Sequence, residues 1–339
     1  MEDVSPLIST EPLHEEWQEV LELGEATFFG VEGPADHPLM WFSPIDLAPG
    51  PGHGVIVTEE SEPDVKLLGP AGNVIATYGN GFGSGPGEFR DTICSVWIPG
   101  TGVLVADGPN NRISVFTENG DYVREIHPKV RTHVLAVSAG RLWTSSWLSS
   151  AIDRVVILDL ETGEALKELG GRYRDEPWAE RFRANCCLSG VRDRMLLSVP
   201  YPYEIQHYSP DGDLLGLFGR RVHGLGPPEE IDFGAGRVLC MSRGGQVGHV
   251  AVFPDSHSLV AFYEHIESGT VAGGGTRIEY VGYFDLFTPE ETWLTTIPEA
   301  DLLPGHEIGA WTIATDGAFW GVVFGEFPRI VRVPLRLLD

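Results

Sequence analysis

Three arginines stand in similar local strings along this chain: Arg90 in FRDTIC, Arg131 in VRTHVL and Arg183 in FRANCC. Each precedes a short apolar run, so equivalent strands would carry the three side chains at one height. A guanidinium binds carboxylate, sulfate or phosphate through two parallel hydrogen bonds. If the three converge, they predict a site for a small anionic ligand on a chain whose formal net charge is -26.

Other polar and aromatic residues fall close to these arginines in the expected register, in which Glu307 takes the place of Arg90. The candidate ligand-binding residues are Arg90, Arg131, His133, Arg183, Asn185, Tyr201, His265, His306 and Glu307. Aromatic side chains beside polar ones suit a ligand pocket. The structural alternative is that the arginines pair with nearby acids, such as Glu88, Asp91 or Glu180, and that most of the other residues are packing residues.

No catalytic or metal-binding motif is complete, so no catalytic residue is assigned. His133, His265 and His306 lie in different segments, and their spacing does not support a zinc site. GxSxG, the P-loop and GxGxxG followed by a helix are all missing. No cofactor is predicted, although a divalent metal such as calcium at the centre of the fold stays open.

Charge and composition restrict the partners. A strongly acidic chain is not expected to bind nucleic acid, which requires a basic surface. No apolar run reaches 18 residues, so no membrane span is predicted. The N-terminal residues lack the basic and apolar regions of a signal peptide, so the compartment is the cytoplasm, or outside it if a leader was removed. The cysteines are expected to be reduced thiols, since none has CxxC spacing: Cys94, Cys186, Cys187 and Cys240.

Residues 78–127 read as one complete four-stranded unit. A glycine-rich loop, Gly79–Gly87, leads into it, and Asn119-Gly120 is a hairpin signal. Four short strands within about 40 residues describe one blade of a β-propeller. The strands are expected at Thr92–Ile98, Val103–Ala106, Arg112–Phe116 and Tyr122–Ile126.

The same rhythm recurs along the chain and predicts an all-β fold, a six-bladed β-propeller of four-stranded blades. Residues 219–245 do not fit the rhythm and are either an insertion or a misassigned strand. The last blade has three strands, and Glu19–Phe29 is a strand without a neighbour. We expect it to pair with Ile330–Leu335 and close the ring, because closure removes an exposed sheet edge. Residues 1–18 would be an N-terminal arm and residues 19–339 a single propeller domain, expected to be a monomer.

The segments GPGEF and VADGPNNRISVF, residues 85–89 and 105–116, resemble an NHL repeat. This resemblance implies a six-bladed propeller in which Asp107 and Arg112 fix a turn. VEGP at Val31–Pro34 resembles the opening of gluconolactonase-like propellers, which use a glutamate with later asparagine and aspartate residues as calcium ligands. Amidating-lyase relatives of NHL proteins use a zinc-binding histidine set. The later motifs of both enzyme groups are not recognisable in this chain.

Two classes of function follow. The favoured one is an NHL-like binding or scaffold protein that presents a site at the channel mouth to a protein partner or a small anionic ligand. The alternative is a hydrolase or lyase, lactonase-like or amidating-lyase-like, which could depend on a metal. The first is favoured because no complete catalytic set is visible, and whether the protein is an enzyme stays open. A divalent metal in the channel with three protein ligands would favour the second.

Overall fold

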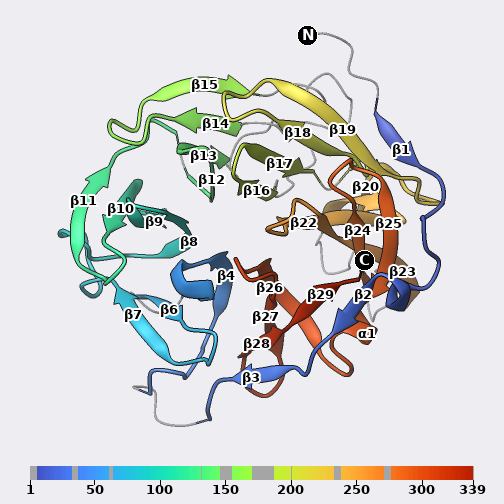
Figure 1. The fold of residues 1–339 in the computed structure, drawn as a ribbon, viewed down its shortest axis with the longest axis horizontal. Coiled ribbons are helices and arrows are strands. Elements are labelled where there is room, and N and C mark those ends of the chain that lie inside the picture. The colour runs from blue at the N-terminus through green and yellow to red at the C-terminus, as the bar shows by residue number, and fades with distance from the viewer. Residues whose placement is uncertain are drawn as a thin grey trace.

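A computed structural model describes residues 6–32, 37–60, 64–130, 132–145, 155–169, 187–199, 201–232, 238–270 and 276–338. Within these residues, six blades of four antiparallel strands stand in a ring around one central axis, and the region along this axis is called the channel (Figure 1). The strands of blades one to three, innermost first, are β4 (Pro44–Pro49), β5 (Val55–Glu59), β6 (Val65–Leu68), β7 (Val74–Tyr78); β8 (Thr92–Ile98), β9 (Gly102–Asp107), β10 (Arg112–Phe116), β11 (Tyr122–Ile126); and β12 (Val134–Ser138), β13 (Arg141–Ser145), β14 (Val155–Leu158), β15 (Ala165–Leu169).

The other three blades repeat this arrangement. Blade five has a fourth strand, β25, that the sequence pattern did not predict. The strands of blades four to six, innermost first, are β16 (Cys187–Val191), β17 (Arg194–Ser198), β18 (Ile205–Tyr208), β19 (Leu214–Arg220); β22 (Gly245–Val252), β23 (Ser258–Thr270), β24 (Thr276–Phe287), β25 (Trp293–Pro298); and β26 (Glu307–Ile313), β27 (Phe319–Phe324), β28 (Arg329–Val333), β3 (Thr27–Phe29).

The N-terminal segment closes the ring, as predicted. β3 is the outermost strand of blade six and runs antiparallel to β28, with Phe29 opposite Ile330. A second short pair, β2 (Leu21–Leu23) with β29 (Leu335–Leu337), extends the contact. Pro334 separates β28 from β29, because proline has no N–H to donate to a neighbouring strand. The last blade is therefore completed by a segment about 300 residues away in the sequence.

Residues before this closure run along the outside of blades four and five. β1 (Leu7–Ser9) lies parallel to β19 and adds a fifth strand to blade four. The amides of Leu13 and His14 then donate hydrogen bonds to the carbonyls of Trp293 and Leu294 in β25. A short 3₁₀ helix (Trp17–Glu19) leads from there into β2.

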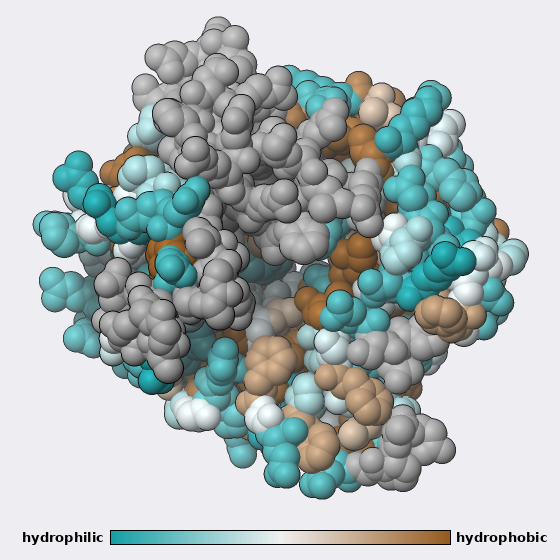
Figure 2. Space-filling view, turned by 180° about the vertical axis from the view of Figure 1, so that it is seen from behind, coloured by the Kyte–Doolittle hydropathy of each residue, from teal (hydrophilic) through white to brown (hydrophobic). Residues whose placement is uncertain are grey.

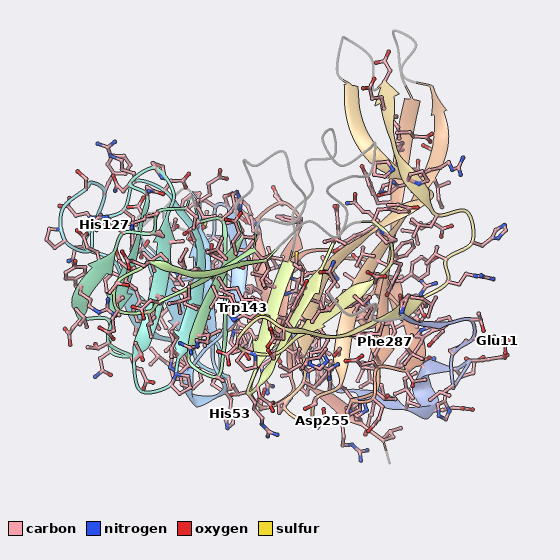
Figure 3. All side chains as sticks on the ribbon, turned by 90° about the horizontal axis from the view of Figure 1, so that it is seen from above. Glu11, His53, His127, Trp143, Asp255 and Phe287 are labelled. Carbon is pink, nitrogen blue, oxygen red and sulfur yellow. The ribbon has the colours of Figure 1, made fainter. Side chains whose placement is uncertain are left out.

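The stretch 219–245 contains an insertion. β20 (Gly226–Asp232) and β21 (Val238–Arg243) form a two-stranded sheet of their own. β23 and β24 also continue beyond blade five, and both hairpins project from the same face of the ring (Figure 3). The remaining helical elements are short, namely Pro51–His53 and α1 (Glu299–Leu302), and no helix in the described part of the chain is long enough to cross a bilayer.

Apolar side chains fill the spaces between neighbouring blades. Between blades five and six, Trp311 stacks on Phe319 at 5.6 Å, and Phe284 meets Trp311 edge-on at 5.1 Å between ring centroids. Between blades four and five, Phe218 meets Phe287 at 5.1 Å in the same manner. Aromatic pairs in these geometries stabilise the packing beyond their buried area.

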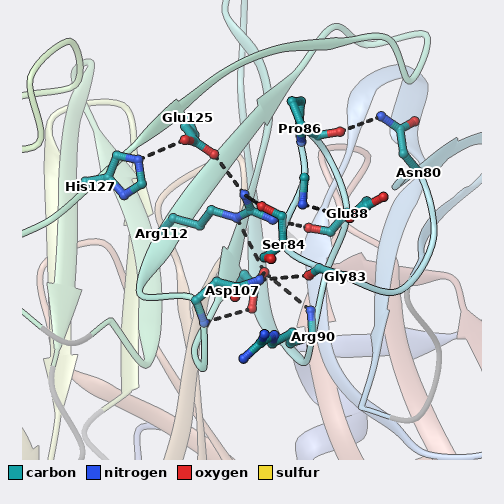
Figure 4. A network of polar contacts seen from close by, with 12 residues as sticks. Asn80, Gly83, Ser84, Pro86, Glu88, Arg90, Asp107, Arg112, Glu125 and His127 are labelled. Carbon is teal, nitrogen blue, oxygen red and sulfur yellow. Dashed lines mark hydrogen bonds and ion pairs between the residues drawn. The ribbon is translucent and has the colours of Figure 1, made fainter.

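The NHL-like segment of blade two is held by Arg112 (Figure 4). Its guanidinium forms ion pairs with Asp107 at 3.5 Å and Glu125 at 2.9 Å. It also donates to the carbonyl oxygens of Ser84, at 3.1 Å, and Glu88. Asp107 in turn accepts hydrogen bonds from the backbone and side-chain amides of Asn110, so the expectation that Asp107 and Arg112 fix a turn is confirmed.

Candidate ligand site at the channel mouth

The channel mouth is the end of the channel at which the six innermost strands begin. Four of these strands have a bulge or register shift close to their first residues. A β-bulge bends a strand and re-aims its side chains, and bulges are frequent beside active sites. The shifts lie between Pro44 and Asp46 in β4, Thr92 and Cys94 in β8, Val247 and Val250 in β22, and Ile308 and Trp311 in β26.

Glycines inside two of these bulges make room for aromatic rings. A Cβ atom at Gly248 would lie 2.6 Å from the Tyr263 ring, and one at Gly309 would lie 2.6 Å from the Phe324 ring. Both distances are too short for any side chain larger than hydrogen. The glycines therefore allow Tyr263 and Phe324, which come from the second strands of blades five and six, to lie across the innermost strands.

One part of the rim is apolar. Phe42 and Ile45 of blade one and Phe324 of blade six are 42%, 38% and 47% exposed. β26 and β4 are neighbouring innermost strands, so these residues belong to adjacent blades. Figure 2 views this face and shows apolar surface beside the central hollow. Exposed aromatic groups next to a channel suit contact with a ligand.

Asp46 follows the β4 bulge on the innermost strand of blade one, and its carboxylate lies against β8 of blade two. The side chain is mostly surrounded by protein but keeps some accessible surface. Burial raises its pKa to about 6, although the Ser95 amide donates to Oδ2 at 3.0 Å and the Leu47 amide also favours the charged form. In the described residues, no basic side chain forms an ion pair with Asp46.

Burial also favours the neutral form of three titratable side chains on other innermost strands. Burial lowers the pKa of His249 to about 4, and its ring meets Trp311 edge-on at 4.9 Å. Burial, with Asp46 nearby, raises the pKa of the Cys94 thiol well above its usual value and that of Cys187 to about 12. Both are free thiols, as predicted, whereas the side chains of Cys186 and Cys240 lie outside the described residues.

Acidic groups lie close together at two places near the mouth. Burial raises the pKa of Tyr263, with further contributions from Glu299 and Glu307. At the rim, burial and then the charges of Glu60 and Asp107 raise the pKa of Asp91. Neighbouring charges of one sign disfavour the ionised form of each other, so the mouth has a negative potential where these residues lie.

Two of the three arginines predicted to converge, Arg131 and Arg183, lie outside the described residues, and so does Asn185. Arg90 is exposed, and only its backbone N–H is bonded, to Asp107 Oδ2 at 3.4 Å (Figure 4). Its guanidinium forms no ion pair or hydrogen bond with the residues that the structure describes. The predicted pairing of Arg90 with Glu88 or Asp91 is therefore not seen.

Strand pairing corrects the predicted register. Thr92 lies opposite Asp107 just before the β8 bulge, and Ile308 lies opposite Val323 just before the β26 bulge. Asp91 is therefore the equivalent of Glu307, and Arg90 is the equivalent of His306. The prediction that Arg90 and Glu307 share a register is wrong by one residue, because the length of the preceding loop does not fix where pairing begins.

The predicted histidines do not come together. His265 lies at the base of the β23–β24 hairpin, where its Nδ1 is 3.1 Å from the Ser242 carbonyl. His306 contacts the outer strands instead, with its ring 5.0 Å from Phe28. His133 directs its backbone N–H to Ser145, and Tyr201 is half-buried beside blade four. Over the described ranges, no three His, Cys, Asp or Glu side chains are placed to hold a metal ion.

Sequence reasoning missed three titratable residues of the innermost strands. Asp46, Cys94 and His249 lie inside apolar runs and are not among the predicted site residues. A charged or imidazole side chain within such a run, as in PIDLAP and VGHVAV, is the signal that could have found two of them. Their direction depends on bulges, which arise from pairing with the next strand.

Comparison with known proteins supports the fold. No protein-family model matches the chain, and no curated protein sequence matches it. A Bacteroides fragilis NCTC 9343 protein described as exported superposes with a TM-score of 0.63 at 11% identity, over 99% of this chain and 100% of that one. This chain is a six-bladed β-propeller.

Two further solved structures share this propeller fold. A DUF4221 family member from Bacteroides vulgatus ATCC 8482 has a TM-score of 0.63 at 9% identity, over 95% of this chain and 100% of that one. A streptogramin B lyase has a TM-score of 0.51 at 11% identity, over 95% of this chain and 100% of that one. At these identities the likeness shows the fold alone.

Replacing Asp46 by Asn should stabilise the protein at pH 7.5. The pKa of Asp46 rises from 3.8 to about 6 on folding, so the folded state binds the proton more tightly than the unfolded state. The wild type therefore loses stability as the pH rises from about 4 through about 6. A shift of two pKa units lowers the free energy of unfolding by about 3 kcal/mol, and the neutral Asn side chain avoids this loss. Urea unfolding of both proteins at pH 3.5 and 7.5 measures this difference. An Asn variant that is no more stable than the wild type at pH 7.5 contradicts the prediction.

Proposed function

We propose that this protein is a non-catalytic binding propeller whose channel mouth holds a small anionic ligand or the acidic end of a protein partner. The observation that carries the proposal is the row of four bulges at one level of the channel. These bulges lie in four neighbouring blades, and polar and aromatic residues lie within or beside them. Two hairpins, β20–β21 and β23–β24, project from the ring on this face, and loops on one face of a rigid scaffold are a common place for binding sites.

Arg90 would anchor the anionic group at the rim. Its guanidinium is exposed and has no acidic partner among the described residues, so it is available for a bidentate contact. Arg131 and Arg183 stand in similar local strings and would add to this contact. An acidic molecule would otherwise be repelled by a chain of net charge -26, so the contact must be local.

Replacing Arg90 by Met should weaken the binding of succinate or phosphate by about 1.5–3 kcal/mol, the typical value of a charged hydrogen bond. The fold should be unchanged because Arg90 is exposed. Isothermal titration calorimetry of both variants measures the effect. Arg141→Met is the matched control, because this exposed arginine begins β13 at the opposite end of the channel. Equal binding by the Arg90 variant and the wild type would refute the anion site.

A lyase is the second candidate, because one solved structure with this fold is a streptogramin B lyase. Asp46, with a pKa near neutrality, suits general acid or base catalysis. The sequence-based form of this candidate could depend on a metal, and among the described residues no three side chains form a metal-ligand set. Incubation with a streptogramin B compound, followed by mass spectrometry, tests it, and product formation that requires Asp46 would favour the enzyme.

A further inference from the structure

We propose that the channel just inside the mouth is a site for a cationic group, a primary ammonium, held by the Asp46 carboxylate. Taken with an anion at Arg90, this makes the ligand a zwitterion such as an amino acid or a short peptide. The inference rests on the proposed function for its second half only. The cation site can be tested alone, with a probe that has no anionic group.

The backbone fixes the Asp46 carboxylate in place. Asp46 follows the β4 bulge, and Oδ2 accepts the Ser95 N–H of β8, the next innermost strand, at 3.0 Å. This hydrogen bond between blades one and two holds the side chain without neutralising it. In the described part of the chain no lysine, arginine or histidine is paired with Asp46. A buried carboxylate without a cation is unfavourable, and a ligand cation would remove that cost.

Neighbouring charges favour a cation over an anion at this depth. Asp46 raises the pKa of both Cys94 and Cys187, so its field reaches across the innermost strands. Glu299 and Glu307 act in the same direction on Tyr263. These effects have one sign, so an anion that enters the channel is repelled and a cation is attracted.

Two further features suit an ammonium group. His249 lies on β22, the innermost strand of blade five, and its ring forms no hydrogen bond with the described residues; in its neutral form one ring nitrogen accepts an N–H. Phe42 and Phe324 at the rim would contact the apolar part of the ligand.

The test uses the full chain and three probes of similar shape: n-butylammonium, n-butanol and butyrate, each titrated by calorimetry in 0.15 M salt. The salt screens non-specific attraction to the acidic surface. We expect n-butylammonium to bind and n-butanol not to bind. Asp46→Asn should weaken n-butylammonium binding at least tenfold, whereas Asp211→Asn, at an exposed turn on the other face, should not change it. Circular dichroism and a thermal melt confirm that both variants are folded.

The pH dependence of n-butylammonium binding shows whether Asp46 binds the ligand directly or only supports the structure. Wild-type affinity for n-butylammonium should rise as the pH increases from 5 to 7, because the carboxylate ionises over this range, and the Asn variant should lack this rise. Equal binding of n-butanol, or binding that Asp46→Asn leaves unchanged, overturns the inference. If succinate binds through Arg90 while n-butylammonium does not bind, the cation site is wrong and the proposed function stands. If n-butylammonium alone binds, the proposed anion site is wrong and the cation site stands.

Discussion

Deleting residues 1–30 should lower the free energy of unfolding by about 5 kcal/mol or more. The deletion removes β3, so β28 becomes an exposed edge and the ring is no longer closed. It also removes Val20, Leu21 and Phe29, which are buried, and each such side chain stabilises the fold by roughly 1.5–3 kcal/mol. The two short pairs that join the ends of the chain are both lost.

A thermal melt followed by circular dichroism measures the effect, with an expected fall of about 10 °C or more. Deletion of residues 1–10 is the control, because it removes only β1, whose Leu7 is 50% exposed. That variant should melt close to the wild type. A protein lacking residues 1–30 that melts at the wild-type temperature would show that closure contributes little.

Replacing Asp285 by Ala should cost about 3–5 kcal/mol, the usual effect of removing one partner from a buried ion pair. Asp285 is 0% exposed and accepts hydrogen bonds from Arg220 Nε at 2.6 Å, Tyr203 at 2.5 Å and the Thr296 hydroxyl. Arg220 comes from blade four and Asp285 from blade five, so this pair joins two blades. Without Asp285, the guanidinium would stay buried and unpaired.

The aromatic surroundings of Arg220 make this loss hard to relieve. The guanidinium carbon lies 5.3, 5.2 and 5.1 Å from the ring centroids of Tyr203, Phe262 and Trp293. These rings keep water from replacing the carboxylate. Urea unfolding measures the effect, and Asp211→Ala, which removes an exposed pair with Arg141, should cost at most about 1 kcal/mol. An Asp285→Ala variant within that limit would mean that the pair between blades four and five has no stabilising role.

The sequence by itself determined the repeat. Alternating apolar residues and turn signals are local, and the strand predicted at Thr92–Ile98 agrees with β8. The missing strand of blade six was also predictable, because a sheet edge must be covered and Glu19–Phe29 was the free segment. The strand β25, with the sequence WLTTIP, was not predicted. It follows the extended β23–β24 hairpin, which is much longer than the hairpins of the other blades and so interrupts the regular spacing of strands in the sequence.

Only the tertiary structure decided where the side chains of the innermost strands lie. Asp46 follows a bulge against the partner strand and His249 lies within one, and a shift of one residue reverses the face of a strand. The pair of Arg220 and Asp285 joins residues 65 positions apart that no local pattern connects. Local alternation therefore encodes the blades, whereas the candidate site depends on register and on contacts between blades, which exist only once the ring has closed.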